Sequence, residues 1–298
     1  MIDKLEYILA LAREKHFGRA AEACGVTQPT LSAGVRQLEQ QMGVLLVNRG
    51  SRFQGFTPEG ERVLDWARRI VGDARAMRDE INTLRSGLSG VLRIAAIPTA
   101  LAMVAALTTP YRERHPNVQF TIYSRTSLEI LELLENLEID AGITYLGNEP
   151  LGRVNSIPLY SERYRLLTSA DAPLGGRETV TWAEVAQVPL CLLTPDMQNR
   201  RIINRLLKAT GVEPRPTLES DSMILLFSHV RTGRWASVMP AKLAETLGLT
   251  DTLRAIPITH PEAVQEIGLV VPAREPMTPV AGALVDEARR IAKSLDAS

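Results

Sequence analysis

The feature that most constrains this chain is a pair of short helices joined by a glycine turn near its N-terminus. The first helix is predicted over residues 19–23 and ends at Cys24-Gly25, because glycine readily adopts the left-handed backbone conformation of a sharp turn. Thr27 is placed to cap the second helix through its hydroxyl. Pro29 stands in the first turn, where its missing N–H does no harm. This order predicts a helix-turn-helix unit.

The second helix, expected to continue to about Gln40, has one apolar and one polar face. Leu31, Val35 and Leu38 recur at helical spacing and predict the buried stripe. Short polar side chains and one arginine occupy the outward positions, and such groups bond base edges and phosphates in a major groove. We therefore predict DNA contacts by Gln28, Pro29, Thr30, Ser32, Ala33 and Arg36. An ordinary pair of core helices is the alternative.

A basic turn follows these helices. The apolar run Val44–Val47 and the extended segment Phe53–Thr57 flank a glycine-containing turn. This order predicts a β-hairpin wing whose tip brings Arg49 and Arg52 to the phosphate backbone. Thr57 and Pro58 then cap and open a third helix.

The segment AAEACGVTQPTLSAGVRQLEQQMGVLLVNR, followed by FTPEG, resembles the LysR-type transcriptional regulators almost without gaps. Two departures from the family pattern are visible. Gly34 lies inside the second helix, where glycine costs up to about 1 kcal/mol against alanine. Val47 replaces the usual phenylalanine. The resemblance implies a winged helix-turn-helix DNA-binding domain, which we place at residues 1–58.

Apolar residues then alternate spacings of four and three from Val63 to Leu88, a pattern typical of a coiled-coil seam. We predict a linker helix over residues 59–86 that pairs with a second copy. A helix packed only on its own domain is the alternative. The residues expected in the dimer interface are Ala67, Ile70, Ala74, Met77, Ile81 and Leu84. A dimer presents two copies of the second helix of the helix-turn-helix unit to DNA, which predicts an interrupted palindrome as the DNA site.

The rest of the chain is predicted to form an α/β domain after a hinge at residues 87–90. Strands alternate with helices between Val91 and Tyr145, which predicts a parallel sheet covered by helices. A change of region is expected near Pro158, followed by a strand at Tyr164–Thr168 and by further strands and helices. Ile267–Val271 is expected to return to the first lobe. We place lobe 1 at residues 91–160 plus 267–298 and lobe 2 at 161–266. LRIAAIPTAL and LENLEIDAGITY resemble the family's effector-binding region, which implies two periplasmic-binding-protein-like lobes.

Ligands of open α/β sheets gather at the carboxyl ends of the strands. Thr99 and Ser127 stand there and are expected to begin helices, whose free N–H groups favour an anion. We predict a small anionic effector, a carboxylate, contacted by Thr99, Ala100, Arg125, Thr126, Ser127, Thr144, Thr194, Met197 and Asp221. Gln198 and Asn199 are expected on the second-lobe wall. Two alternatives stay open: Thr99 and Ser127 as helix caps only, and Arg125 as a solvated charge.

Composition and the absence of certain motifs limit the classes of protein to which this chain can belong. Lys+Arg and Asp+Glu each number 34, so DNA affinity has to come from the placement of charges rather than from a basic surplus. The charged N-terminus and the lack of a long apolar run predict a cytoplasmic protein with no membrane partner. The two cysteines, Cys24 and Cys191, lie in different predicted domains and are expected to be buried thiols. Metal-binding, nucleophile-elbow and phosphate-loop motifs are missing, which predicts no cofactor, metal or catalytic residue.

The resemblance further implies the partners. The family's pattern is a homodimer that assembles into a homotetramer on double-stranded promoter DNA, responds to a small-molecule effector and contacts RNA polymerase where it activates. A regulator of the same fold with a redox or non-anionic signal is the alternative, and a ligand-binding enzyme is a further one. A DNA-bending structural protein without a ligand is a third class, but it would not need the two-lobed C-terminal part.

Overall fold

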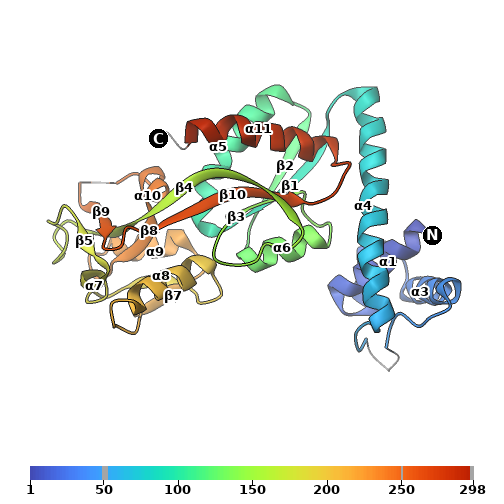
Figure 1. Ribbon diagram of the computed structural model, residues 1–298, viewed down its shortest axis with the longest axis horizontal. Helices are drawn as coiled ribbons and strands as arrows, with labels where there is room; N and C mark the ends of the chain where they lie inside the picture. The colour runs from blue at the N-terminus through green and yellow to red at the C-terminus, as the bar shows by residue number, and fades with distance from the viewer. Residues whose placement is uncertain (49–52, 250, 296–298) are drawn as a thin grey trace. The chain divides into compact units, whose positions relative to one another are not determined.

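A computed structural model describes residues 1–48, 53–249 and 251–295. The chain divides into two compact units, which are described separately (Figure 1). Unit 1 comprises Met1–Leu88 with the short segments Glu135–Glu138 and Arg274–Pro279. Unit 2 comprises Ser89–Leu134, Ile139–Ala273 and Val280–Ser298. Within the described ranges, no helix combines the length and the apolar character that a bilayer crossing requires.

The described residues of unit 1 form four helices: α1 (Ile2–Glu14), α2 (Phe17–Ala23), α3 (Gln28–Met42) and α4 (Pro58–Ser86). Their apolar stripes share one core, which includes Leu5 and Ile8 of α1, Leu31 and Leu38 of α3, and Leu64 of α4. The Thr27 hydroxyl accepts a hydrogen bond from Thr30 N and so caps α3 as the sequence predicted. The helix-turn-helix fold is confirmed.

A buried carboxylate fixes the segment that follows α3. Glu39 is 7% exposed, and its Oε1 accepts hydrogen bonds from Leu46 N at 2.9 Å and Val47 N at 3.3 Å. Val47 forms an antiparallel bridge with Phe56, which gives the wing its two sides. Arg49 and Arg52, the predicted wing tip, lie outside the described residues.

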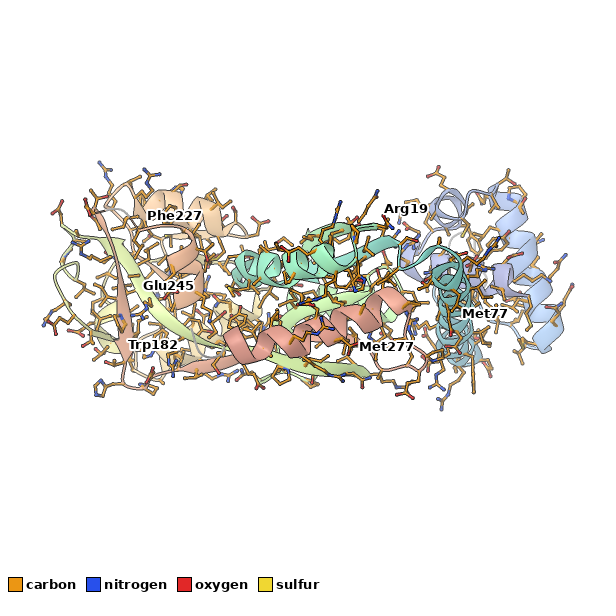
Figure 2. All side chains as sticks on the ribbon, turned by 90° about the horizontal axis from the view of Figure 1, so that it is seen from above. Arg19, Met77, Trp182, Phe227, Glu245 and Met277 are labelled. Carbon is orange, nitrogen blue, oxygen red and sulfur yellow. The ribbon has the colours of Figure 1, made fainter. Side chains whose placement is uncertain are left out.

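The long helix α4 has one buried and one exposed apolar face. Leu64, Ala67 and Val71 are buried in the core of unit 1. An exposed apolar stripe lies on another face, formed by Trp66, Ile70, Met77, Ile81 and Leu84, whose exposed fractions run from 36% to 82%. Met77 of this stripe is labelled in Figure 2. The sequence prediction included Ala67 and omitted Trp66. Ala67 is fully buried within its own unit, because the α4 face that packs on α1 passes through it.

Unit 2 contains two α/β lobes. The first has strands β1 (Gly90–Ala96), β2 (Val118–Ser124) and β3 (Ala141–Tyr145), with β1 central and parallel to both neighbours. The helices of this lobe are η1 (Pro98–Ala100), α5 (Leu101–Arg114), α6 (Ser127–Glu135) and α11 (Pro279–Leu295). Helices α5 and α11 lie side by side, and Tyr111 Oη of α5 donates a hydrogen bond to Val280 O at 3.0 Å (Figure 1).

The second lobe has shorter elements. Its strands are β5 (Val180–Thr181), β6 (Cys191–Leu193), β7 (Leu218–Ser220), β8 (Ser237–Pro240) and β9 (Leu253–Thr259). Its helices are α7 (Trp182–Val185), α8 (Gln198–Lys208), α9 (Met223–Val230) and α10 (Ala241–Thr246). The buried side chains of Leu167, Cys191, Leu226 and Met239 belong to one core cluster of this lobe.

Two long antiparallel strands join the lobes. β4 (Val154–Ser169) pairs with β10 (Val264–Pro272) from Val154 to Arg163, and β4 then continues to pair with β8 and β9 in the second lobe (Figure 1). The sequence prediction had only Tyr164–Thr168 as a strand and missed β9. Pro158 concealed the first half of β4. The strand continues through Pro158 because the β4–β10 register shifts between Ile267 and Gly268, and proline is tolerated at such an irregularity.

The glycine inside α3 has a packing reason. A Cβ at Gly34 would lie 2.6 Å from Cδ2 of Tyr7, closer than two carbon atoms can approach. We expect Gly34→Ala to lower the free energy of unfolding by about 1–3 kcal/mol through overpacking. In a Tyr7→Ala background, the same substitution should instead stabilise by up to about 1 kcal/mol, because alanine is the better helix former.

Urea unfolding of the four proteins in this double-mutant cycle measures both effects. Ala33→Gly, at the exposed neighbouring position, is the control and should destabilise equally in both backgrounds. An equal effect of Gly34→Ala with and without the Tyr7 ring would contradict the packing explanation.

Candidate functional site

The outer face of α3 is the first candidate surface. Gln28, Pro29, Thr30, Ala33 and Arg36 are exposed there, and Ser32 is half-buried. Their exposure follows from the buried stripe on the opposite side, where Leu31 and Leu38 have no accessible surface. The Thr30 hydroxyl lies 2.9 Å from the Thr27 hydroxyl, so part of its hydrogen-bonding capacity is used at the cap.

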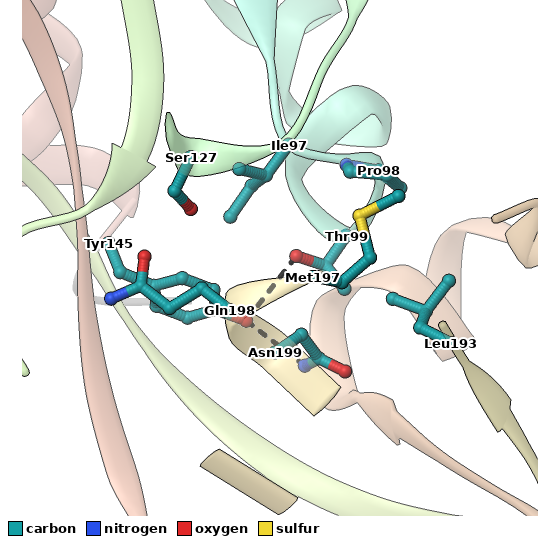
Figure 3. Close-up of a pocket in the computed structure, with 9 residues that line it drawn as sticks. All are labelled: Ile97, Pro98, Thr99, Ser127, Tyr145, Leu193, Met197, Gln198 and Asn199. Carbon is teal, nitrogen blue, oxygen red and sulfur yellow. Dashed lines mark hydrogen bonds between the residues drawn. The ribbon is translucent and has the colours of Figure 1, made fainter. Parts of the chain in front are cut away.

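The second candidate site is a pocket in unit 2, at the carboxyl ends of β1 and β3. Its empty volume is about 190 Å³. This volume includes space that is open to solvent, so the pocket is small. Apolar and neutral polar side chains surround it, and none of the lining residues is charged. They are Ile97, Pro98, Thr99, Ser127, Tyr145, Leu193, Met197, Gln198 and Asn199 (Figure 3).

The start of α6 places a hydroxyl in this pocket. Thr126 is the residue that caps the helix: its Oγ1 accepts from Glu129 N at 3.2 Å, and Glu129 Oε2 accepts from Thr126 N at 2.8 Å. Ser127, one position later, is therefore not used as a cap. Its hydroxyl is buried and has no hydrogen-bond partner among the described residues. The Thr-x-x-Glu pattern of residues 126–129 is a capping-box signal that predicts this division of roles.

Tyr145, the last residue of β3, is the centre of a buried hydrogen-bond network. Its hydroxyl lies 2.7 Å from Oε1 of Glu162, on β4. Asn199, in the first turn of α8, donates from Nδ2 to the same hydroxyl at 3.0 Å, and Thr99 Oγ1 lies 3.4 Å away (Figure 3). Both lobes thus contribute to one network beneath the pocket. The sequence prediction missed Tyr145 and Glu162, because neither stands in a recognisable motif.

Burial controls the protonation of this network. Desolvation raises the pKa of Glu162 to about 8, and the hydrogen bond from Tyr145 opposes that shift only in part. Burial raises the pKa of Tyr145 well above its usual range, and the nearby Glu162 adds to the increase. Tyr164 has a raised pKa for the same reasons. Its hydroxyl lies near Tyr145 and Asn199 without a hydrogen bond of normal geometry to any described residue.

The structure distributes the predicted effector residues unevenly. Thr99, Ser127 and Met197 line the pocket, as do Gln198 and Asn199. The other predicted residues, which are Ala100, Arg125, Thr126, Thr144, Thr194 and Asp221, are not among its lining. For Arg125 the reason is its orientation: Nη1 donates to Ser124 O at 2.7 Å, and the guanidinium lies over the Tyr123 ring on the exposed side of β2.

The cysteines occupy separate environments. Cys191 is fully buried, its Sγ lies 3.5 Å from Ala236 O, and burial raises the pKa of its thiol to about 11. Cys24 belongs to unit 1 and is half-buried, and desolvation raises its pKa as well. Both thiols are therefore protonated at neutral pH. The reactive form of a cysteine is the thiolate, so neither thiol is in its reactive form. Among the residues that the structure describes, no cluster of His, Cys, Asp and Glu could hold a metal ion.

A capped helix-turn-helix followed by a two-lobed domain with a small pocket defines a class: DNA-binding regulators that carry a ligand domain. Comparison with known families agrees. Residues 2–61 match the bacterial regulatory helix-turn-helix proteins of the lysR family, and residues 85–293 match the LysR substrate binding domain. The chain belongs to the LysR family of transcriptional regulators.

Individual relatives cover nearly the whole chain. The DNA-binding transcriptional dual regulator OxyR of Escherichia coli K12 is 28% identical over 93% of this chain and 90% of its own length. The hydrogen peroxide-inducible genes activator of Haemophilus influenzae is 28% identical over 99% of both chains. Among solved structures, a full-length cysteine-to-aspartate variant of OxyR from Pseudomonas aeruginosa is 26% identical over 97% of both chains, with a TM-score of 0.75.

Proposed function

We propose that this LysR-type regulator binds an interrupted-palindrome promoter site through α3 and changes transcription when a small effector occupies the pocket of unit 2. The observation that carries the proposal is the combination of an exposed polar face on a capped α3 with a pocket whose buried Ser127 hydroxyl has no hydrogen-bond partner in the described part of the chain. A buried hydroxyl without a partner costs about 1–3 kcal/mol, which a ligand that bonds it recovers.

We infer that the effector is a small carboxylate. Ser127 is the first residue of α6, and the N-terminus of a helix offers backbone N–H groups and the positive end of its dipole to an anion. Hydroxyls of Thr99, Ser127 and Tyr145 supply neutral donors, and Ile97 and Leu193 supply apolar surface for the rest of the molecule. Arg125 is not proposed as the carboxylate's partner, because it does not line the pocket.

A redox signal is the second candidate, because relatives of this chain are named for induction by hydrogen peroxide. The thiol geometry gives it less support. Cys191 is the single cysteine of unit 2, and its buried, protonated thiol is poorly suited to attack a peroxide. A peroxide signal in this chain would have to act without a cysteine pair in the effector unit.

We further propose that α4 pairs with α4 of a second copy through the exposed stripe of Trp66, Ile70, Met77, Ile81 and Leu84. Five large apolar side chains on one face of one helix exceed the scattered exposure that is normal for a single chain. Half-buried Ala74 lies between them on the same face. Dimers pairing into a homotetramer, contact with RNA polymerase and a cytoplasmic location follow the family's pattern and are part of this proposal.

The DNA-binding role is tested by selecting genomic fragments with the full-length protein and measuring affinity for the selected sites. Gln28→Ala should weaken binding by about 1–3 kcal/mol at one base position and relax the preference there. Gln41→Ala, an exposed glutamine at the other end of α3, is the matched control and should leave the preference unchanged. Equal effects of the two substitutions would contradict base contact by the first turn of α3.

The dimer interface is tested by light scattering. Met77→Glu combined with Ile81→Glu places two charges on the exposed stripe and should convert dimers or larger assemblies to monomers, because like charges would have to be desolvated together. Asn82→Glu introduces charge at an exposed position on another face of α4 and should leave the assembly intact. An unchanged mass for the double variant would exclude this stripe as the interface.

The effector role is tested by thermal unfolding at pH 6 with acetate, propionate and benzoate against chloride at equal ionic strength. A ligand bound only by the folded state raises stability by about 2.7 kcal/mol at a hundredfold excess over its dissociation constant. Ser127→Ala should weaken binding roughly tenfold or more, because a hydrogen bond to a charged group contributes about 1.5–3 kcal/mol. Ser228→Ala, on the exposed side of α9, should bind as the native protein does. Equal binding by both variants would exclude Ser127 from the site.

A further inference from the structure

The Glu162 carboxyl lies directly behind the pocket and is poorly solvated by the protein. It is 1% exposed, and Tyr145 is the residue that bonds its Oε1. Oε2 is buried without a hydrogen-bond partner among the described residues. An ionised carboxylate in such a place would be held by a single hydrogen bond, which falls far short of what burying a charge requires. The neutral acid is the form that this environment accepts.

The groups that face Glu162 from the elements around it do not compensate its charge. Tyr145 of β3 contacts the carboxyl, and Tyr160 and Tyr164 flank it on β4 itself. Opposite it on β10 stands Gln265, which carries no charge. From α8 comes the amide of Asn199. Within the described part of the chain, Glu162 forms no salt bridge with any of these elements.

Two nearby cations are engaged elsewhere. Arg200, which follows Asn199 on α8, bonds Glu219 at 2.8 Å and donates to Leu193 O. Lys242 of α10 lies over the ring of Tyr160, with its Nζ 5.4 Å from the ring centroid. Neither cation is among the causes that shift the pKa of Glu162, which are burial and the Tyr145 hydrogen bond. The protonation of Glu162 is therefore governed by burial and by Tyr145.

The proton on Glu162 decides what Tyr145 offers to the pocket. An ionised Glu162 accepts the Tyr145 O–H at 2.7 Å, so Tyr145 presents a lone pair to the pocket and Asn199 donates to it. A protonated Glu162 can donate its own O–H to Tyr145. The Tyr145 hydroxyl can then donate its hydrogen bond toward Thr99 and the pocket. One proton thus converts Tyr145 from an acceptor to a donor on the face where a ligand would bind.

We propose that Glu162 is a positioning residue of the effector site that acts as a neutral acid, so that the carboxylate effector and one proton are bound together. The bound carboxylate accepts a hydrogen bond from the Tyr145 hydroxyl. Ionised Glu162 weakens carboxylate binding in two ways: it takes up that hydrogen-bond donor, and its negative charge repels the ligand. The inference rests on the proposed carboxylate effector and adds the residue that makes its binding depend on pH. No covalent or redox step is involved.

A measurement without ligand tests the first half of this proposal, which is that Glu162 is a neutral acid at pH 7. Infrared spectra of the full-length protein in D₂O should show the carbonyl stretch of a protonated carboxylic acid at pH 7, lost with a midpoint of about 8. The band should be missing from Glu162→Gln. Glu266→Gln is the matched control, since Glu266 is an exposed carboxyl on β10 and its removal should leave the band in place. Identical spectra for native protein and Glu162→Gln at pH 7 would overturn the neutral acid.

Binding of acetate, propionate and benzoate between pH 6 and pH 9.5 tests the second half. Affinity in the native protein should be constant below about pH 7 and fall toward tenfold per pH unit above the midpoint of about 8, because the ionised form must first take up a proton. Glu162→Gln should bind the carboxylates with the same affinity at pH 6 and pH 9.5, since its amide donates to Tyr145 at both pH values. Tyr145→Phe removes the donor and should bind weakly at every pH.

The outcomes separate this inference from the function on which it rests. Carboxylate binding with the same pH dependence in native protein and Glu162→Gln would overturn the role of Glu162 and leave the carboxylate site standing. Binding of none of the three carboxylates at pH 6, by native protein or Glu162→Gln, would overturn the carboxylate site and this inference with it, while the DNA-binding assignment would be unaffected.

Discussion

The antiparallel pairing of β4 with β10 is the constraint on which the whole effector unit depends. These two strands pass from one lobe to the other, and each lobe completes its sheet on them: β3 adds to β10 in the first lobe, and β8 and β9 add to β4 in the second. The pocket residues Thr99 and Tyr145 come from the first lobe and Asn199 from the second. They meet because the shared strands hold both lobes in one sheet. Glu162 stands on β4 beneath this meeting point, in register with Gln265 of β10.

The pocket lining is uncharged. Apolar side chains, hydroxyls and amides surround it, while some charged side chains close to it form ion pairs. Arg201 of α8, for example, forms a two-pronged ion pair with Glu149, at 2.7 and 2.8 Å. Neutral donors in a small, partly closed space can hold an anion because the low local dielectric strengthens each hydrogen bond. The same low dielectric makes the charge state of one buried carboxyl matter more than it would at a surface.

In the DNA-binding unit, one face of helix α3 packs in the core and the opposite face stays exposed. In α3 a buried stripe and a hydroxyl cap fix the helix, and the polar outer face is left exposed. Glu39 shows how a charged residue can serve the fold: its carboxylate binds two backbone N–H groups of the following segment and so ties the wing to α3. One face of helix α4 packs in the core of this unit, and another face carries an apolar stripe that stays exposed. That exposed stripe supports the use of α4 in pairing.

Local rules allowed much of this to be predicted from the sequence. The helix-turn-helix, the cap at Thr27, the long helix and the strand–helix alternation each depend on spacing within one segment, where periodicity and turn chemistry suffice. Ser127 and Thr99 were found because they follow strands and precede helices. The same reasoning misplaced Arg125, since a strand end does not reveal which face a long side chain takes. Ala67 was assigned to the wrong face of α4 because a heptad spacing does not say which neighbour buries a residue.

What the sequence by itself determined is therefore the family, the order of elements and the hydroxyls that stand at the strand ends. Tertiary structure alone decided that β4 continues through Pro158, that Tyr145, Glu162 and Asn199 form one network, and that Glu162 is buried without a salt bridge among the described residues. These facts depend on contacts between segments far apart in the chain. A carboxyl group's burial, and with it the proton that it keeps, is a property of its surroundings and has no signature in the local sequence.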